Sequence, residues 1–179
     1  IDSSLLVSFL YTMSNTANYP ALYYAIENQN PIYEMYELIK SGIDVNTQDE
    51  YGRTALMKAV GWGEHSPGMV RLLVAAKADA NKQTKEGMTA LMITTMYGGE
   101  HAAGMMRLLV DAGADVNKQD KGGSTALMLA ARYGDRLGKH AVGMMRLLLD
   151  AGADADKQDN YGRTALVFAT DEEGEHGAV

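Results

Sequence analysis

The chain has 179 residues, of which 46% are hydrophobic and 22% are charged, so it is long enough for one globular domain with a continuous core. It contains no Cys, which excludes disulfides, thiolate zinc sites and a cysteine nucleophile. A net charge of -7 and a pI of about 5.0 argue against a general nucleic-acid-binding protein, because contacts with phosphates need a basic surface. The apolar runs fall well short of the ~20 residues of a membrane-spanning helix, and we expect a soluble, cytoplasmic protein.

The first twenty residues predict an amphipathic helix. Leu5, Phe9 and their apolar neighbours recur at helical spacing, a serine precedes them as an N-cap, and Pro20 ends the connection. We expect this helix, over residues 1–19, to cap the start of the fold. The sequence begins at Ile1 rather than Met, which leaves open whether a signal peptide preceded it.

Two short motifs alternate along the rest of the chain. Gly-x-Thr-Ala-Leu occurs four times, with its Thr at positions 54, 89, 125 and 164, and Gly-Met-(Met/Val)-Arg-Leu-Leu three times, with its Arg at positions 71, 107 and 146. Each Arg is followed 18 residues later by the next Thr, whereas the distance from Thr to Arg varies from 17 to 21. The variable part is Gly-rich and polar, which indicates a loop. Recurrence at this interval indicates stacked repeats.

Each motif predicts a short helix. The Thr of the first motif is a good N-cap, and the apolar residues from Leu56 to Val60 have the spacing of one helix face. The second helix ends at a glycine such as Gly113, which can take the left-handed conformation that closes a helix. Lys77 stands in that place in the first complete unit, so we expect a left-handed lysine there. The polar stretch that follows is rich in turn-forming residues and predicts a hairpin-like finger.

The order of helix, turn, helix and finger, with Gly-x-Thr-Ala-Leu opening a unit and Leu-Leu-x-x-Ala-Gly-Ala-Asp-x-Asn closing it, resembles the ankyrin repeat family. The family's usual Thr-Pro-Leu-His is Thr-Ala-Leu-Met here, and longer loops stretch the usual period of ~33 residues. The resemblance implies an all-α solenoid of stacked helix-turn-helix units with finger loops. After the capping helix, it implies a degenerate first repeat at 20–50, repeats at 51–85, 86–121 and 122–160, and a partial repeat at 161–179.

The candidate chemical sites have structural explanations. The four histidines occupy one place in successive units, about 8–10 Å apart, whereas zinc needs its nitrogen ligands at about 2.0 Å. We therefore expect a structural role beside the start of the second helix, and no metal or cofactor. The Gly-rich loops at 98–101 and 134–139 lack the Gly-Lys-Ser/Thr ending of a phosphate-binding loop. Since no unit-specific cluster of polar groups is visible, we expect no enzymatic activity.

Aromatic residues end the first helix of three units. Trp62, Tyr97 and Tyr133 occupy this position, and such side chains anchor interfaces because they bury a large area with few rotatable bonds. In the ankyrin family this position and the finger tips face the concave side, where partners bind. The aromatic series could instead pack between units, but we favour binding. The finger tips vary from unit to unit, as expected of positions that set specificity: Tyr51 and Arg53, Lys85 and Met88, Lys121 and Ser124, Tyr161 and Arg163.

These residues predict a protein-protein interaction module or scaffold that holds its partner on the concave face. Basic residues gather on this face of an acidic chain, so we expect the partner protein to carry an acidic patch, and we expect neither nucleic acid nor membrane as partner. The basic residues are Arg53, Lys85, Lys121, Arg132 and Arg163.

The last unit predicts an uncovered edge. Because the sequence stops before the second helix of this unit, we expect a fragment of a longer array or larger protein, with Leu166 and Phe168 partly uncovered and able to support end-to-end self-association. The alternative function is therefore a regulatory or targeting arm of a larger enzyme or channel.

Overall fold

The computed structural model describes residues 21–27, 31–61, 66–97, 99–134 and 138–170. The predicted capping helix and Trp62 lie outside the described residues. Within these residues every regular element is helical, and none of the helices is long and apolar enough to cross a membrane. The α-helices are α2 (Ala21–Glu27), α3 (Pro31–Lys40), α4 (Ala55–Ala59), α5 (Ser66–Ala75), α6 (Ala90–Tyr97), α7 (Ala102–Asp111), α8 (Ala126–Arg132), α10 (Ala141–Asp150) and α11 (Ala165–Thr170), and the 3-10 turns are η2 (Gly99–His101) and η3 (Gly138–His140).

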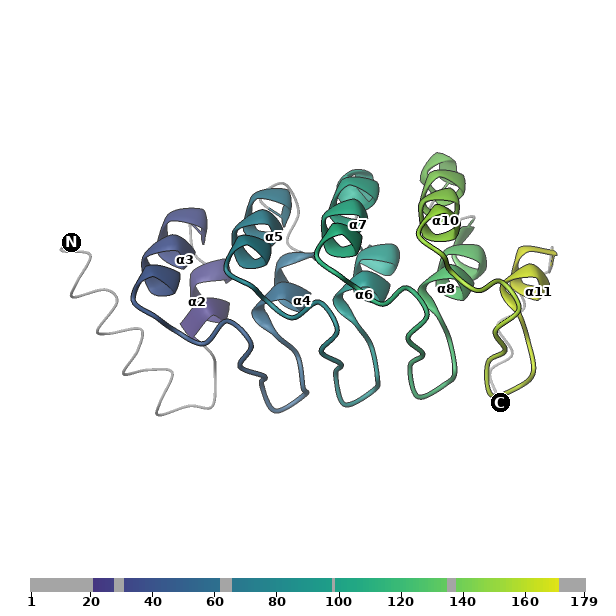
Figure 1. Cartoon of the computed structure of the whole chain (residues 1–179), viewed down its shortest axis with the longest axis horizontal. Coiled ribbons are helices and arrows are strands. Elements are labelled where there is room, and N and C mark those ends of the chain that lie inside the picture. The colour runs from purple at the N-terminus through teal and green to yellow at the C-terminus, as the bar shows by residue number, and fades with distance from the viewer. Residues whose placement is uncertain (1–20, 28–30, 62–65, 98, 135–137, 171–179) are drawn as a thin grey trace.

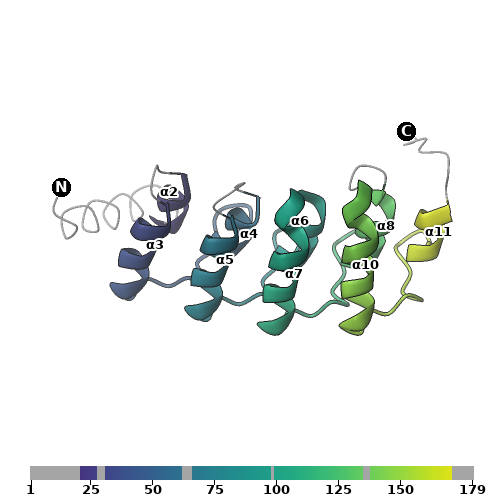
Figure 2. The same ribbon diagram turned by 90° about the horizontal axis from the view of Figure 1, so that it is seen from above.

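The helices stack in two rows along one axis (Figures 1 and 2). We call α2, α4, α6, α8 and α11 the inner helices, and α3, α5, α7 and α10 the outer helices. Each of α2, α4, α6 and α8 packs against the outer helix of its own unit and the inner helix of the next. Among the described elements, α11 packs mainly against α8. The connecting loops project from one side as fingers (Figure 1). The arrangement confirms the expected all-α solenoid of stacked helix-turn-helix units.

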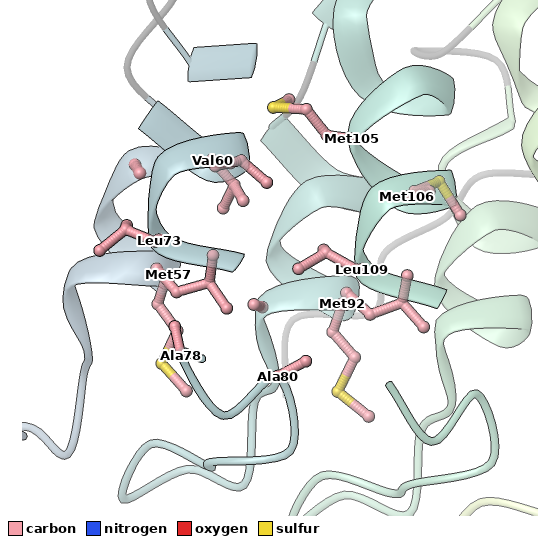
Figure 3. Packing of buried hydrophobic residues seen from close by; sticks show 14 of the residues in the cluster. Met57, Val60, Leu73, Ala78, Ala80, Met92, Met105, Met106 and Leu109 are labelled. Carbon is pink, nitrogen blue, oxygen red and sulfur yellow. The ribbon is translucent and has the colours of Figure 1, made fainter. Parts of the chain in front are cut away.

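The hydrophobic core runs the length of the stack. Met57 and Leu73 of one unit are buried, as are their counterparts Met92 and Leu109 of the next unit, and Val60 of the first unit is buried as well (Figure 3). Methionines recur at the same buried positions, so most of the described methionines pack the core. The hydrophobic core is therefore distributed along the array and has no single centre, as expected where each repeat contacts only its neighbours.

The inner helices begin at threonine caps. The hydroxyl oxygens of Thr54, Thr89 and Thr125 each accept a hydrogen bond from the backbone N–H three residues later, at 3.3 Å. This bond satisfies one of the donors that a helix leaves unpaired at its start. The predicted N-cap role is confirmed for these three residues.

The outer helices end in a left-handed residue. Lys77 has φ 66°, as predicted from its replacement of glycine. The Lys77 N–H donates to the carbonyl of Val74 and the Ala78 N–H to that of Leu73, both at 3.0 Å, which is the Schellman arrangement. The same pair of bonds closes the other three outer helices around Gly42, Gly113 and Gly152.

Candidate partner-binding surface

Four fingers carry the predicted tip residues, with turns at 49–53, 84–88, 120–124 and 159–163. In the third, the Asp120 N–H donates to the Ser124 carbonyl at 3.0 Å and the Gly123 N–H to the Asp120 carbonyl at 2.9 Å. The other three repeat both bonds. These bonds confirm the hairpin-like fingers expected from the turn-forming residues.

Neighbouring fingers bond directly to one another. A backbone N–H of each later finger donates to a carbonyl of the finger before it: Lys85 to Tyr51 at 2.8 Å, and Lys121 to Glu86 at 3.0 Å. The last finger repeats this bond from Asn160 to Gly122, at 3.0 Å. Because backbone hydrogen bonds connect neighbouring fingers, the finger tips form a surface of defined geometry.

A row of glutamines adds a second set of bonds between the fingers. The Nε2 of Gln83 donates to the carbonyl of Gly87 within its own finger and to that of Gln119 in the next, the latter at 3.1 Å. Gln48 and Gln119 make the corresponding pairs of bonds. Each amide therefore fixes the spacing of two units.

The side chains of Tyr51 and Arg53 contact each other at the tip of the first finger. The Arg53 guanidinium lies over the Tyr51 ring, 4.8 Å from its centroid, and its Nε donates to Asp49 Oδ2 at 2.7 Å. The other oxygen of Asp49 accepts the backbone N–H groups of Tyr51 and Arg53, at 2.9 and 2.8 Å. One carboxylate thus holds both the turn and the arginine, while Tyr51 is 57% exposed.

Tyr161 and Arg163 repeat this construction at the last finger. Arg163 lies over Tyr161 at 4.8 Å and bonds to Asp159 Oδ2 through Nε and Nη2, at 2.9 and 2.7 Å. Burial alone raises the pKa of the Asp159 carboxyl, but hydrogen bonds from the Arg163 side chain and from the N–H groups of Arg163 and Tyr161 hold it below its ordinary value. Asp159 therefore stays ionised. The ring of Tyr161 is the exposed part of this finger, since Tyr161 is 81% exposed.

The two middle fingers carry lysines rather than tyrosine-arginine pairs. Lys85 and Lys121 are exposed. Met88 is half-buried against the core cluster. Ser124 is only 7% exposed, and its N–H donates to Asp120 Oδ1 at 2.8 Å. Within the predicted set, the exposed aromatic tip side chains, Tyr51 and Tyr161, therefore lie on the first and last fingers.

The helix-end series is not uniform. Tyr97, at the end of α6, is 62% exposed, whereas Tyr133, just after α8, is half-buried and packs against the core cluster. The neighbouring Arg132 lies over the ring of Phe168, 4.4 Å from its centroid. Since Arg163 lies over the same ring at 4.8 Å, the structure brings a helix-end residue and a finger residue together on one face.

Phe168 was not among the residues predicted to bind a partner. It stands four residues after the N-cap Thr, where the earlier units have Lys58, Ile93 and Leu129. The signal was the appearance of an aromatic ring at a position otherwise filled by aliphatic residues or a lysine. Phe168 is half-buried, while its neighbour Leu166 is 70% exposed although the corresponding Leu56 is 1% exposed.

Two of the four histidines lie in the described residues. His101 and His140 are the N-cap residues of α7 and α10, but neither side chain makes the capping hydrogen bond. No group of three or more histidine and acidic residues in the described ranges is arranged to hold a metal ion. His101 and His140 thus stand at the start of the second helix of their units without capping it through their side chains.

Comparison with family models identifies ankyrin repeats over nearly the whole chain. A model described as "Ankyrin repeats (3 copies)" matches residues 63–139 and 103–179, and one described as "Ankyrin repeats (many copies)" matches residues 22–73. A search of curated proteins finds no match. The chain belongs to the ankyrin repeat family, whose members generally serve as protein-protein interaction modules.

Proposed function

We propose that this chain binds a partner protein on the surface formed by the finger tips and the C-terminal ends of the inner helices. The observation that carries the proposal is the meeting of Arg132 and Arg163 on Phe168, because it joins the two predicted residue sets into one surface. Exposed aromatic residues at Tyr51, Tyr97 and Tyr161 support it, since such side chains contribute most to binding. The basic residues of the surface favour an acidic partner.

Site-specific cross-linking tests this proposal. A photoreactive phenylalanine analogue is placed at Tyr97 or, as control, at Val142, which is 64% exposed on the outer helix α10. The proposal expects cross-links to a captured protein from position 97 and few from position 142. Cross-links from position 142 alone would assign binding to the outer helices instead.

The exposed edge of the last unit supports a second proposal, end-to-end self-association. Leu166 is 70% exposed, and a Cβ added to Gly162 meets nothing within 4 Å, whereas the corresponding Gly87 is covered by the next finger. Self-association would cover this edge with a like unit. A molecular mass that stays monomeric in light scattering at rising concentration, for wild type as for Leu166→Lys, would rule it out. If the edge is covered within a longer protein, the array serves instead as its regulatory or targeting arm.

A further inference from the structure

Two arginines from different units lie against one aromatic ring. The guanidinium carbons of Arg132 and Arg163 are 4.4 and 4.8 Å from the centroid of the Phe168 ring. The two positive charges are therefore at most about 9 Å apart, which is close to the Debye length of about 8 Å at physiological ionic strength. Because their repulsion is only partly screened, this site favours an anion.

One carboxylate neutralises only one of these arginines. Asp159 Oδ2 accepts both bonds from Arg163, and Oδ1 accepts the backbone N–H groups of Tyr161 and Arg163. Both oxygens are thus used within the finger. No carboxylate of the described ranges lies within 4.0 Å of a nitrogen of Arg132 in an ion pair, so among the described residues the two arginines share one carboxylate partner.

This arrangement occurs once among the described unit boundaries. At the positions of Arg132 and Phe168, the three earlier boundaries have Glu27 with Lys58, Gly61 with Ile93 and Met96 with Leu129, none of which combines an arginine with an aromatic ring. At the first finger, Arg53 has the same Asp and Tyr neighbours as Arg163, but Lys58 stands where the last unit has Phe168. The paired arginines are therefore a specific feature of the last boundary and not of the repeat.

We propose that Arg132 and Arg163, held against Phe168, form a carboxylate clamp that binds an Asp or Glu side chain of the partner protein. The proposal rests on the proposed function, because it names the chemistry recognised at one end of the same surface. A carboxylate can accept hydrogen bonds from both planar guanidinium groups. The ring and Asp159 restrict the arginine conformations before binding, which lowers the ordering cost of the contact.

A peptide titration tests the clamp. The probes are an acetylated, amidated peptide of six glutamates and its six-glutamine counterpart, added to the full chain labelled with 15N at low salt. We expect only the glutamate peptide to shift the Nε–Hε signals of Arg132 and Arg163. Arg132→Gln should weaken its binding about five- to tenfold, and Phe168→Leu should weaken it by a smaller factor because the apolar contact remains. Arg132→Lys should give an intermediate loss.

Arg71→Gln is the matched control, because Arg71 is an exposed arginine on the outer helix α5. Its affinity should stay within about twofold of wild type. Equal losses in Arg132→Gln and Arg71→Gln would overturn the clamp in favour of general charge attraction, and so would an unshifted Arg132 signal at millimolar peptide. Shifts confined to other finger-tip residues would overturn the clamp alone. Shifts confined to the outer helices would overturn the proposed function as well.

Discussion

The backbone N–H of Asp115 donates a hydrogen bond to Asn81 Oδ1 at 2.7 Å, across the boundary between two units. The Asn81 side chain also donates a hydrogen bond from Nδ2 to the carbonyl of Gly113 at 2.8 Å. An amide can serve both groups because it carries a donor and an acceptor. The boundaries before and after repeat the bond to Oδ1, from Asp79 to Asn46 and from Asp154 to Asn117.

Asn81→Ala should destabilise the array by about 0.5–1.5 kcal/mol for each of the two bonds lost, because water replaces Asn81 as partner of the exposed Asp115 N–H and Gly113 carbonyl. Urea unfolding measures this loss. Asp156→Ala is the control: Asp156 takes the place of the asparagine in the last such loop, and no bond from its side chain to a described residue is present. Its effect should stay within about 0.5 kcal/mol. Equal losses in the two variants would contradict the bridging role of Asn81.

Lys77→Gly should stabilise the protein. A left-handed conformation costs an L-residue about 1–2 kcal/mol, and Lys77 adopts it with φ 66°. Thermal unfolding should show a rise of about 2–4 °C for each kcal/mol gained. Gly113→Ala, at φ 88° with nothing within 4 Å of the added Cβ, should show the opposite shift. An unchanged or lower melting temperature for Lys77→Gly would contradict the strain assigned to this helix end.

Gly87→Ala and Gly162→Ala should separate backbone strain from finger stacking. Both glycines have positive φ, 82° and 77°, but only at Gly87 would a Cβ lie 2.8 Å from the Asp120 Cα and the Lys121 nitrogen. Both variants force an alanine into a left-handed conformation, which lowers the free energy of unfolding. Gly87→Ala should lower it by about 1–3 kcal/mol more, because the added Cβ overpacks the next finger. The difference between their free energies of unfolding measures this second effect. Equal losses would mean that the fingers are not in rigid contact.

Asp159 should make stability depend on pH. Its pKa is held below the ordinary value of 3.8 in the folded chain, mainly by Arg163 against the opposing effect of burial. A depressed folded pKa adds stability that is present above the ordinary pKa of the unfolded chain and is lost as pH falls through the folded pKa. The difference in unfolding free energy between wild type and Asp159→Asn should therefore be larger at about pH 6 than at about pH 2. A difference that does not change with pH would contradict the assignment.

Much of the fold was predictable from local signals. The Thr caps, the closing glycines and the left-handed Lys77 follow from residue preferences within a single turn, and they recur often enough to define the unit. The bonds between units were not predictable in the same way. The roles of Asn81 and Gln83 depend on the register of fingers some 35 residues apart, which turn-forming composition does not specify.

The candidate surface was predictable only as a set of positions. Variation between units indicated Arg53 and Arg163 as candidate binding residues. Their side-chain hydrogen bonds to Asp49 and Asp159 were not predictable, because an aspartate at this place indicates only a turn. Ser124 varies like the other tip residues, yet its small side chain is buried. The ring shared by two arginines depends on side-chain conformations across a unit boundary, and no spacing rule describes these.

The affinity of a partner protein for paired surface variants is the most direct test of partner binding at the finger tips and the ends of the inner helices. A protein retained by the immobilised chain is purified and titrated against wild type, Tyr97→Ala with Tyr161→Ala, and Val142→Ala with Leu149→Ala. The control pair lies on the outer helix α10 and is also exposed, at 64% and 49%. We predict at least about a tenfold rise in Kd for the tyrosine pair and less than about twofold for the control. Wild-type affinity in the tyrosine pair, with the loss of affinity in the control pair, would place the partner on the outer helices instead.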